Sequence, residues 1–509
     1  MDTIIFGYLQ AGAAYLLIIM LLSIIMVATG KYGGNRAALL WGIIVFALIT
    51  VLATYTRLQL IPFNADESRR TFLLTGDEPA YLMTALSIAH DGDIDLANNV
   101  ANKDYLHFQK RKYSGSGYTF YNSLSNNRLE NKKEDWGNSR YMRHRPGTSV
   151  LLTPAFMLAD HNNRFWAYTI MSFCFAVFFG LVVYYMSRVE GTPLSVILTV
   201  CLICGLSPPV FFYANQAYPE VPAGILLTLI CMLFLRSRNL WILPFVLAAA
   251  LIWFTDRTIL PTLIVCAGGL YYLPSTSKKL IAICVLGGSG LLFAFYCMHR
   301  FGVPYPISHN TVMGFSFDKI PTRLLQIFFD GKRGWFWLFP PVLLLPAMLW
   351  QISKSRNITL NHICLMTAFL VLVALVAAFD DWAGGTCPSG RYFVVPQFLF
   401  ILLAAVWLMD ERGQKIKMFW IIGLGALGIM QLFWLTSHPR WWYRAYHPMF
   451  AWKDIQPLYA YLPLLPDGAP KEQWLQLAKI APLLMFPSLS CIYLEWRQKR
   501  TKTQSIGYK

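Results

Sequence analysis

The sequence predicts an all-α polytopic membrane protein, because apolar residues are abundant and charged residues are scarce. Of its 509 residues, 56% are hydrophobic and only 14% are charged. Soluble domains usually carry about 25% charged residues. Long apolar segments recur along the chain, and about thirteen of them approach the roughly 20 residues that a spanning helix needs. We therefore expect a bundle of about 13 transmembrane helices with a large outer loop that carries amphipathic surface helices.

The expected spans are separated mostly by short polar loops. They cover residues 10–29, 38–57, 164–186, 193–213, 219–235, 239–255, 258–273, 280–298, 335–352, 361–380, 392–409, 418–437 and 476–495. The first segment has no basic region or small-residue cleavage site of a signal peptide, so we expect it to be retained. Residues 1–495 then form one transmembrane domain with the loop 58–163 inserted, and residues 496–509 form a basic cytoplasmic tail.

Lysines and arginines in the short loops predict the orientation, because they concentrate on the cytoplasmic side. Those sharing one side are Lys31, Arg36, Arg188, Arg236, Arg238, Lys278, Lys279, Lys354, Arg356, Arg412, Lys415 and Lys417, with the tail from Arg497. The opposite loops 299–334 and 438–475 also carry basic residues, but the run of short loops outweighs them. Loop 58–163 is therefore expected outside, with the shorter loops 213–220, 255–257 and 380–392.

Net charge indicates which partners to expect, and the cysteine positions indicate whether disulfides or a zinc site are expected. The formal net charge is +17, but the basic residues lie between membrane spans. Orientation and binding of anionic membrane lipids explain them better than nucleic acid does. Nine of the ten cysteines lie within apolar segments, and Cys387 is the exception. We expect neither a disulfide framework nor a zinc site.

Two adjacent carboxylates mark the stretch 75–99, TGDEPAYLMTALSIAHDGDIDLANN. Pro79 suits the first position of a helix, where its missing N–H costs nothing. Apolar residues then recur with helical spacing, which predicts one apolar face, and Gly92 ends the helix. Asp77 precedes the helix N-terminus, where the helix dipole favours an ionised carboxylate. It is either a base at the membrane edge or an acidic cap on a surface helix.

Five motifs, taken in order, resemble those of the GT-C membrane glycosyltransferases. This family includes protein O-mannosyltransferases, the lipid A aminoarabinose transferase and serotype-converting O-antigen glucosyltransferases. The motifs are TGDEPAYL, HRPGTSVLLTP, YPEVPA, DGKRGWFWLFPP and WAGGTCPSGRYFVVP. In most of the family the acidic loop follows the first span, whereas here it follows the second. An extra N-terminal span restores the family's sidedness.

The resemblance implies an enzyme of the bacterial inner membrane whose active site faces the periplasm. It implies a polyprenyl-phosphate sugar as donor and a lipopolysaccharide, O-antigen or other cell-envelope glycan or glycolipid as acceptor. Transfer with inversion needs a base for the acceptor hydroxyl and positive charge for the departing phosphate. Asp77 is the candidate base, and Glu78 or Glu220 would orient the acceptor or a divalent cation, if the enzyme uses one.

Arginine side chains match phosphate oxygens in bidentate fashion, so basic residues of the outer loops are candidates for the donor phosphate. They are Arg143, Arg145, Arg257, Lys332, Arg333 and Arg391. Simpler roles remain open for several residues. Glu220 also suits an acidic helix start, and Arg257 a pair with Asp256.

The other polar and aromatic residues of the outer loops suggest structural roles. His144 and His309 are expected to be structural. Trp441, Trp442, Tyr443 and Tyr446 fit an interfacial aromatic belt, with sugar stacking as the less favoured alternative.

Two other functions remain open beside glycosyl transfer. A transporter or flippase of lipid-linked sugars would share the basic outer face, and so would a membrane ligase or polymerase of glycan chains. A transporter places polar residues near the middle of broken helices. Few ionisable residues lie within the expected spans here, which favours chemistry at an outer cavity.

Overall fold

The computed structural model describes the chain from residue 77 onward, with gaps. The described residues are 77–104, 124–126, 140–142, 144–158, single positions between 167 and 182, 194–214, 216–236, 240–302, 304, 316–330, 334–355, 358–380, 382, 390–408, 413–437 and most of 481–497. The expected spans 10–29 and 38–57, the loop segments 58–76 and 438–475 and the residues after 497 lie outside this set. Cys387, His309 and the aromatic cluster near residue 442 lie outside it too.

Helices dominate the described chain, as the sequence predicted. Four of them are long and apolar enough to cross a membrane: Thr276–Phe301, Leu360–Ala378, Arg391–Leu408 and Gln414–Leu432. Shorter apolar helices accompany them. The prediction of an all-α membrane protein is confirmed at this level, and the number of 13 spans stays a prediction.

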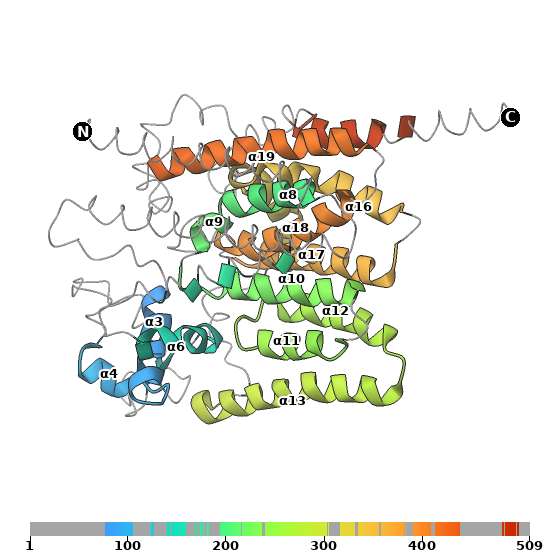
Figure 1. Ribbon diagram of the computed structural model, residues 1–509. Coiled ribbons are helices and arrows are strands. Elements are labelled where there is room, and N and C mark those ends of the chain that lie inside the picture. The colour runs from blue at the N-terminus through green and yellow to red at the C-terminus, as the bar shows by residue number, and fades with distance from the viewer. Residues whose placement is uncertain are drawn as a thin grey trace.

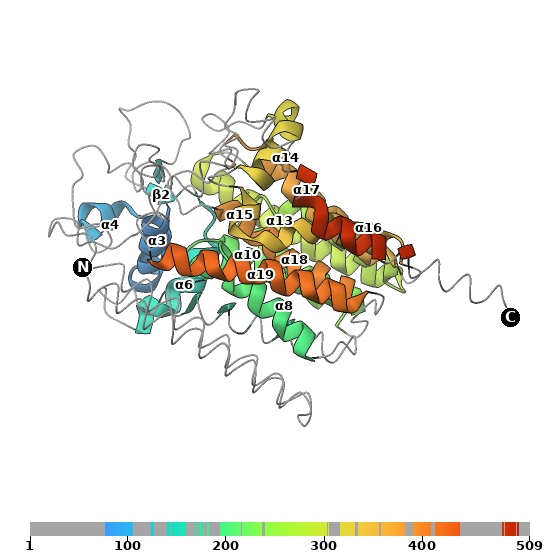
Figure 2. The same cartoon turned by 90° about the horizontal axis from the view of Figure 1, so that it is seen from above.

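The apolar helices lie side by side along one common direction (Figure 1). They are α8 (Leu194–Leu206), α10 (Glu220–Arg236), α11 (Leu243–Leu251), α12 (Ile259–Tyr272), α13 (Thr276–Phe301), α17 (Leu360–Ala378), α18 (Val394–Leu408) and α19 (Gln414–Ser437). Three helices of the large loop, α3 (Glu78–His90), α4 (Ala97–Ala101) and α6 (Gly147–Leu158), gather at one end of this bundle. Figure 2 shows the same gathering from above.

Helix α18 is the centre of the bundle, and α13 is at its edge. All but one of the residues of α18 are buried, between α10, α17 and α8. A helix that is apolar on every side belongs in a core. In α13, by contrast, Leu280, Leu291 and Phe295 are exposed, as expected of a helix that faces lipid.

Two expected spans are broken by prolines. The segment 335–352 forms α15 (Trp335–Leu338), the 3₁₀ turn η4 (Pro340–Leu344) and α16 (Leu345–Ser353) instead of one helix. Segment 193–213 likewise divides into α8 and the short α9 (Val210–Tyr213) around Pro208 and Pro209. Proline cannot donate a backbone hydrogen bond and its ring clashes with the preceding turn, so the helix stops there.

The acidic stretch folds largely as predicted, with one correction. Pro79 lies in the first turn of α3, and Gly92 follows its end with a positive φ of 75°. The predicted single apolar face is wrong, because every residue from Glu78 to Ser87 is buried. Helix α6 covers α3, and the Ser149 hydroxyl donates a hydrogen bond to the Tyr81 carbonyl oxygen at 3.0 Å.

The remaining elements lie between and beside these helices. A short antiparallel ribbon pairs β1 (Leu124–Asn126) with β2 (Arg140–Met142). The 3₁₀ turn η3 (Phe317–Lys319) leads into α14 (Ile320–Phe329), and η5 (Arg391–Phe393) leads into α18. Helices α10, α12 and α18 all begin at the end where α3 and α6 lie.

Candidate functional site

Five charged or titratable side chains from distant parts of the chain meet at the end of the bundle that α3 covers. Asp77 precedes α3, and His144 precedes α6. Glu220 opens α10, Arg257 lies in the turn before α12, and Arg391 opens η5. We call these five residues the charged cluster. All of them come from loops that the sequence predicted on the same, outer side.

Asp77 bridges two of the basic groups. Its Oδ2 lies 2.8 Å from Nη1 of Arg391, and its Oδ1 lies 3.3 Å from Nε2 of His144. Asp77 lies at the N-cap position of α3, as the alternative interpretation expected, but its side chain makes no capping hydrogen bond there. Like Arg257, Asp77 keeps about a fifth of its side chain exposed, 20% against 21%.

The two basic neighbours set the ionisation of Asp77. Burial by itself would raise the pKa of the carboxyl, but the charges and hydrogen bonds of His144 and Arg391 outweigh it. The pKa of Asp77 is therefore held well below its usual range. Asp77 is an anion at any physiological pH, and its carboxylate binds a proton only weakly.

Arg391 holds the two carboxylates together. Its Nε donates to Oε1 of Glu220 at 2.6 Å, while its Nη1 donates to Asp77. The guanidinium carbon lies 4.4 Å from the centre of the Tyr218 ring. Gly390 precedes it with a φ of +88°, and a Cβ there would meet the side chain of Pro209 at 2.9 Å. The glycine thus allows the close turn that delivers Arg391.

Arg257 lies beside this pair but is held more loosely. Its Nη1 is 3.5 Å from Oε1 of Glu220. Its guanidinium carbon lies over the Tyr392 ring at 3.6 Å, and its side chain is 21% exposed. A planar guanidinium lying over an aromatic ring keeps its edge available for further hydrogen bonds. The acidic partner that the structure records is Glu220 and not the adjacent Asp256.

Glu220 is the buried acid of the cluster. It is the first residue of α10, and its Oε1 accepts hydrogen bonds from both Arg391 and Arg257. No described residue hydrogen bonds to its other oxygen, Oε2, which is buried. A buried polar atom usually has a partner.

Glu78 is adjacent to Asp77 in sequence but acts elsewhere. It is fully buried, and its Oε1 accepts a hydrogen bond from the backbone N–H of Ala217 at 2.9 Å. This contact fixes the segment before α10 against the start of α3. Glu78 therefore sets the position of Glu220 relative to Asp77.

The structure places another candidate away from the cluster. Arg145 donates from Nη1 to the Ile252 carbonyl oxygen, and its guanidinium lies over the Phe293 ring at 4.3 Å. These contacts attach the start of α6 to α11 and α13. Arg143, Lys332 and Arg333 lie outside the described residues.

Sequence reasoning expected His144 to be structural and did not consider Tyr218 or Tyr392. All three lie in the quoted motifs, Tyr392 next to Arg391 and Tyr218 two positions before Glu220. Their chemistry became visible only from the neighbours that folding supplies, because none of those neighbours is close in sequence.

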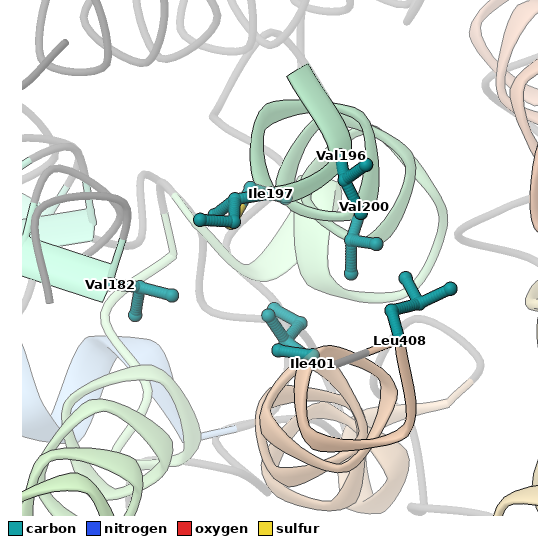
Figure 3. A pocket seen from close by; sticks show the side chains of 8 residues that line it. Val182, Val196, Ile197, Val200, Ile401 and Leu408 are labelled. Carbon is teal, nitrogen blue, oxygen red and sulfur yellow. The ribbon is translucent and has the colours of Figure 1, made fainter. Parts of the chain in front are cut away.

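The described part of the chain shows no group of metal ligands and one apolar cavity of note. No three His, Cys, Asp or Glu side chains group there to hold a metal ion. One apolar cavity lies between α8 and α18 (Figure 3), and its lining includes Val196, Ile401 and Leu408. None of its lining residues belongs to the charged cluster, and all of them are apolar.

No family model, no curated protein and no solved structure matches the chain.

Proposed function

We propose that this membrane protein transfers a sugar from a polyprenyl-phosphate-linked donor to an extracytoplasmic acceptor hydroxyl. The observation that carries the proposal is the bridge from Asp77 through Arg391 to Glu220, with Arg257 beside it. It combines a permanently ionised carboxylate and two guanidinium groups at one end of an apolar bundle. The resemblance of five sequence motifs to the GT-C glycosyltransferases points to the same chemistry.

The proposed reaction is an inverting displacement. The acceptor oxygen attacks the anomeric carbon of the sugar, and the bond from that carbon to the phosphate oxygen breaks. Asp77 supplies the negative charge that drives deprotonation of the acceptor hydroxyl. Because the leaving group is a phosphate, fixed positive charge is more useful than a strong general acid.

Arg257 is the better candidate for the leaving phosphate. Arg391 already donates to two carboxylates and is 8% exposed, so binding phosphate would mean breaking short ion pairs. Arg257 has one long contact with Glu220 and is more exposed. We therefore assign the phosphate contact to Arg257 and the alignment of Asp77 and Glu220 to Arg391.

The distribution of basic residues supports an outer-face location for the cluster. Helix α10 begins at Glu220 and ends at Arg236, so this arginine is at the far end of the bundle. Lys278 and Lys279 open α13, which runs back from that far end, and Lys415 opens α19 there. An excess of basic residues is typical of the cytoplasmic side. The charged cluster then faces the periplasm of a bacterial inner membrane.

The location of the charges favours an enzyme over a flippase. The charged cluster lies at helix beginnings, in the turn before α12 and in η5. A transporter would need its polar groups near the middle of the membrane, where both sides can reach them. A glycan ligase would use the same outer face and is distinguished by its donor, a preassembled glycan on a lipid carrier.

The test is transfer of a radiolabelled hexose from polyprenyl phosphate by the purified full-length chain, with lipopolysaccharide as acceptor. Label moving to the acceptor and released polyprenyl phosphate are the expected products. A flippase would move labelled donor across vesicles without cleaving it. Donor that stays intact with every hexose tested, in protein that melts cooperatively, would contradict glycosyl transfer.

A further inference from the structure

We infer that His144 is a catalytic residue of the charged cluster, the group that takes the proton from the acceptor hydroxyl, and that Asp77 positions it. This inference rests on the proposed glycosyl transfer and adds the atom that receives the proton. Its basis is the contact between Nε2 of His144 and Oδ1 of Asp77, 3.3 Å apart.

The contact defines the tautomer of the imidazole. An ionised carboxylate only accepts hydrogen bonds, so Nε2 of His144 carries the hydrogen and donates it to Asp77. In the neutral ring, Nδ1 is then the basic nitrogen. A carboxylate that orients a histidine and stabilises the imidazolium it becomes is the arrangement used to activate hydroxyl nucleophiles elsewhere.

Asp77 suits the positioning role better than the proton-accepting role. A general base works best when its pKa lies near the working pH, and the guanidinium of Arg391 beside Asp77 lowers the pKa of that carboxyl below its usual range. Both carboxylate oxygens of Asp77 already have a basic partner, Arg391 at Oδ2 and His144 at Oδ1. An imidazole is the side-chain base most often used near neutral pH.

His144 is held from two sides, as a base must be. The next residue, Arg145, is attached to the Ile252 carbonyl oxygen, and Gly147 donates its N–H to the Trp253 carbonyl oxygen at 2.9 Å. A Cβ on Gly147 would lie 2.6 Å from that oxygen, so the approach requires glycine. On the other side the Tyr81 ring lies 5.3 Å from the imidazole.

Other titratable groups lie near the imidazole of His144. Asp77 and Tyr81 face it from α3 and its approach, and Arg391 and Glu220 lie behind Asp77. The His144 side chain is 13% exposed, as needed for a small hydroxyl to reach it.

The proton and electron movements balance in one step. The O–H bond of the acceptor breaks and its proton moves to Nδ1 of His144. The oxygen forms the bond to the anomeric carbon, and the electron pair of the carbon–oxygen bond leaves with the phosphate. The imidazolium that results stays paired with Asp77 and returns its proton to water.

Chemical rescue tests this role. His144→Ala should lower transfer about 10²–10⁴-fold, and added imidazole should restore part of the rate. Across a series of substituted imidazoles of similar size, the restored rate should rise with the basicity of the free base. A merely structural histidine would give no dependence on basicity.

Three further variants make the outcome decisive. His144→Gln keeps an N–H donor for Asp77 but has no basic nitrogen, so it should be as slow as His144→Ala. His90→Ala removes an exposed histidine at the far end of α3 and should transfer at the parental rate. Asp77→Asn should be slow and not rescued by imidazole.

Parental transfer by His144→Gln, or loss without rescue in folded His144→Ala, would overturn the role of His144 while leaving glycosyl transfer intact. If the parental chain transfers no sugar, the proposed function fails instead.

Discussion

The carboxylate of Asp77 lies 2.8 Å from the guanidinium of Arg391, although 314 positions separate the two residues in the chain. The same guanidinium binds Glu220 at 2.6 Å. One arginine therefore joins the start of α3 to the start of α10 and of η5. This arrangement lowers the pKa of Asp77, and it makes the site depend on three segments that are far apart in the sequence.

Asp77→Asn should abolish most activity and leave the helix start intact. Asparagine has the same shape and is as good at a helix start, and the Asp77 side chain makes no capping bond in the parent. The loss of charge should lower sugar transfer about 10²–10⁴-fold, since acid–base assistance is worth that much. Initial rates from labelled polyprenyl-phosphate sugar measure it, with thermal melting as the folding control.

Glu78→Gln is the matched control for that variant. The amide keeps an oxygen that can accept from the Ala217 N–H, so the activity should fall less than in Asp77→Asn. Parental activity in Asp77→Asn would refute the mechanism and favour a transporter.

Arg257→Ala should lower turnover about 10²–10³-fold, the usual cost of removing one electrostatic contact to a transition state. Arg257→Lys should also be slow, because an ammonium lacks the planar group that lies over Tyr392 and binds phosphate in bidentate fashion. The measurement is the rate of release of polyprenyl phosphate at saturating donor.

Arg145→Ala is the control for Arg257→Ala, because it removes an arginine outside the charged cluster. Its guanidinium attaches the start of α6 to α11 and lies over Phe293, so its loss should lower the melting temperature more than the turnover of the folded fraction. If Arg257→Ala turns over like the parent while folded, Arg257 does not bind the phosphate.

Acidification should remove the stabilisation that Asp77 provides. Burial raises the pKa of this carboxyl, but His144 and Arg391 lower it further, so the folded value lies below the unfolded value of about 3.9. A lowered pKa stabilises the fold above the unfolded pKa, and this contribution is lost as the pH falls through the folded pKa.

The melting temperature of the parent minus that of Asp77→Asn should therefore shrink as the pH falls below about pH 4. Melting in detergent over this range measures it. A difference that grows below about pH 4 would show that Asp77 is not held ionised by its partners.

Labelling of single cysteines should establish the orientation. Asn102→Cys lies at the exposed end of α4, near the charged cluster, and Ser277→Cys lies at the exposed start of α13, at the opposite end of the bundle. A membrane-impermeant maleimide added to intact cells should label position 102 and spare position 277. The reverse pattern would place the charged cluster in the cytoplasm and exclude a periplasmic acceptor.

Helix prediction succeeded where the signal was local. Runs of apolar residues located α10, α12, α13, α17, α18 and α19 within a few residues. Prediction failed at 335–352, where the run was apolar but two prolines interrupted the backbone hydrogen bonds. It also failed for the environment of α3, because one apolar face in sequence does not reveal that α6 covers the other side.

The sequence by itself determined that the chain is rich in apolar helices, as a membrane protein is, and it predicted Asp77, Glu220, Arg257 and Arg391 in loops on one side of the bundle. These properties follow from composition and local periodicity. The tertiary structure alone decided that Arg391 joins Asp77 to Glu220, that Arg145 points to α11, and that His144 contacts Asp77. The reason is physical. The two partners of each contact lie far apart in the sequence and meet only when the helices pack, so no local sequence pattern shows which residues will be neighbours.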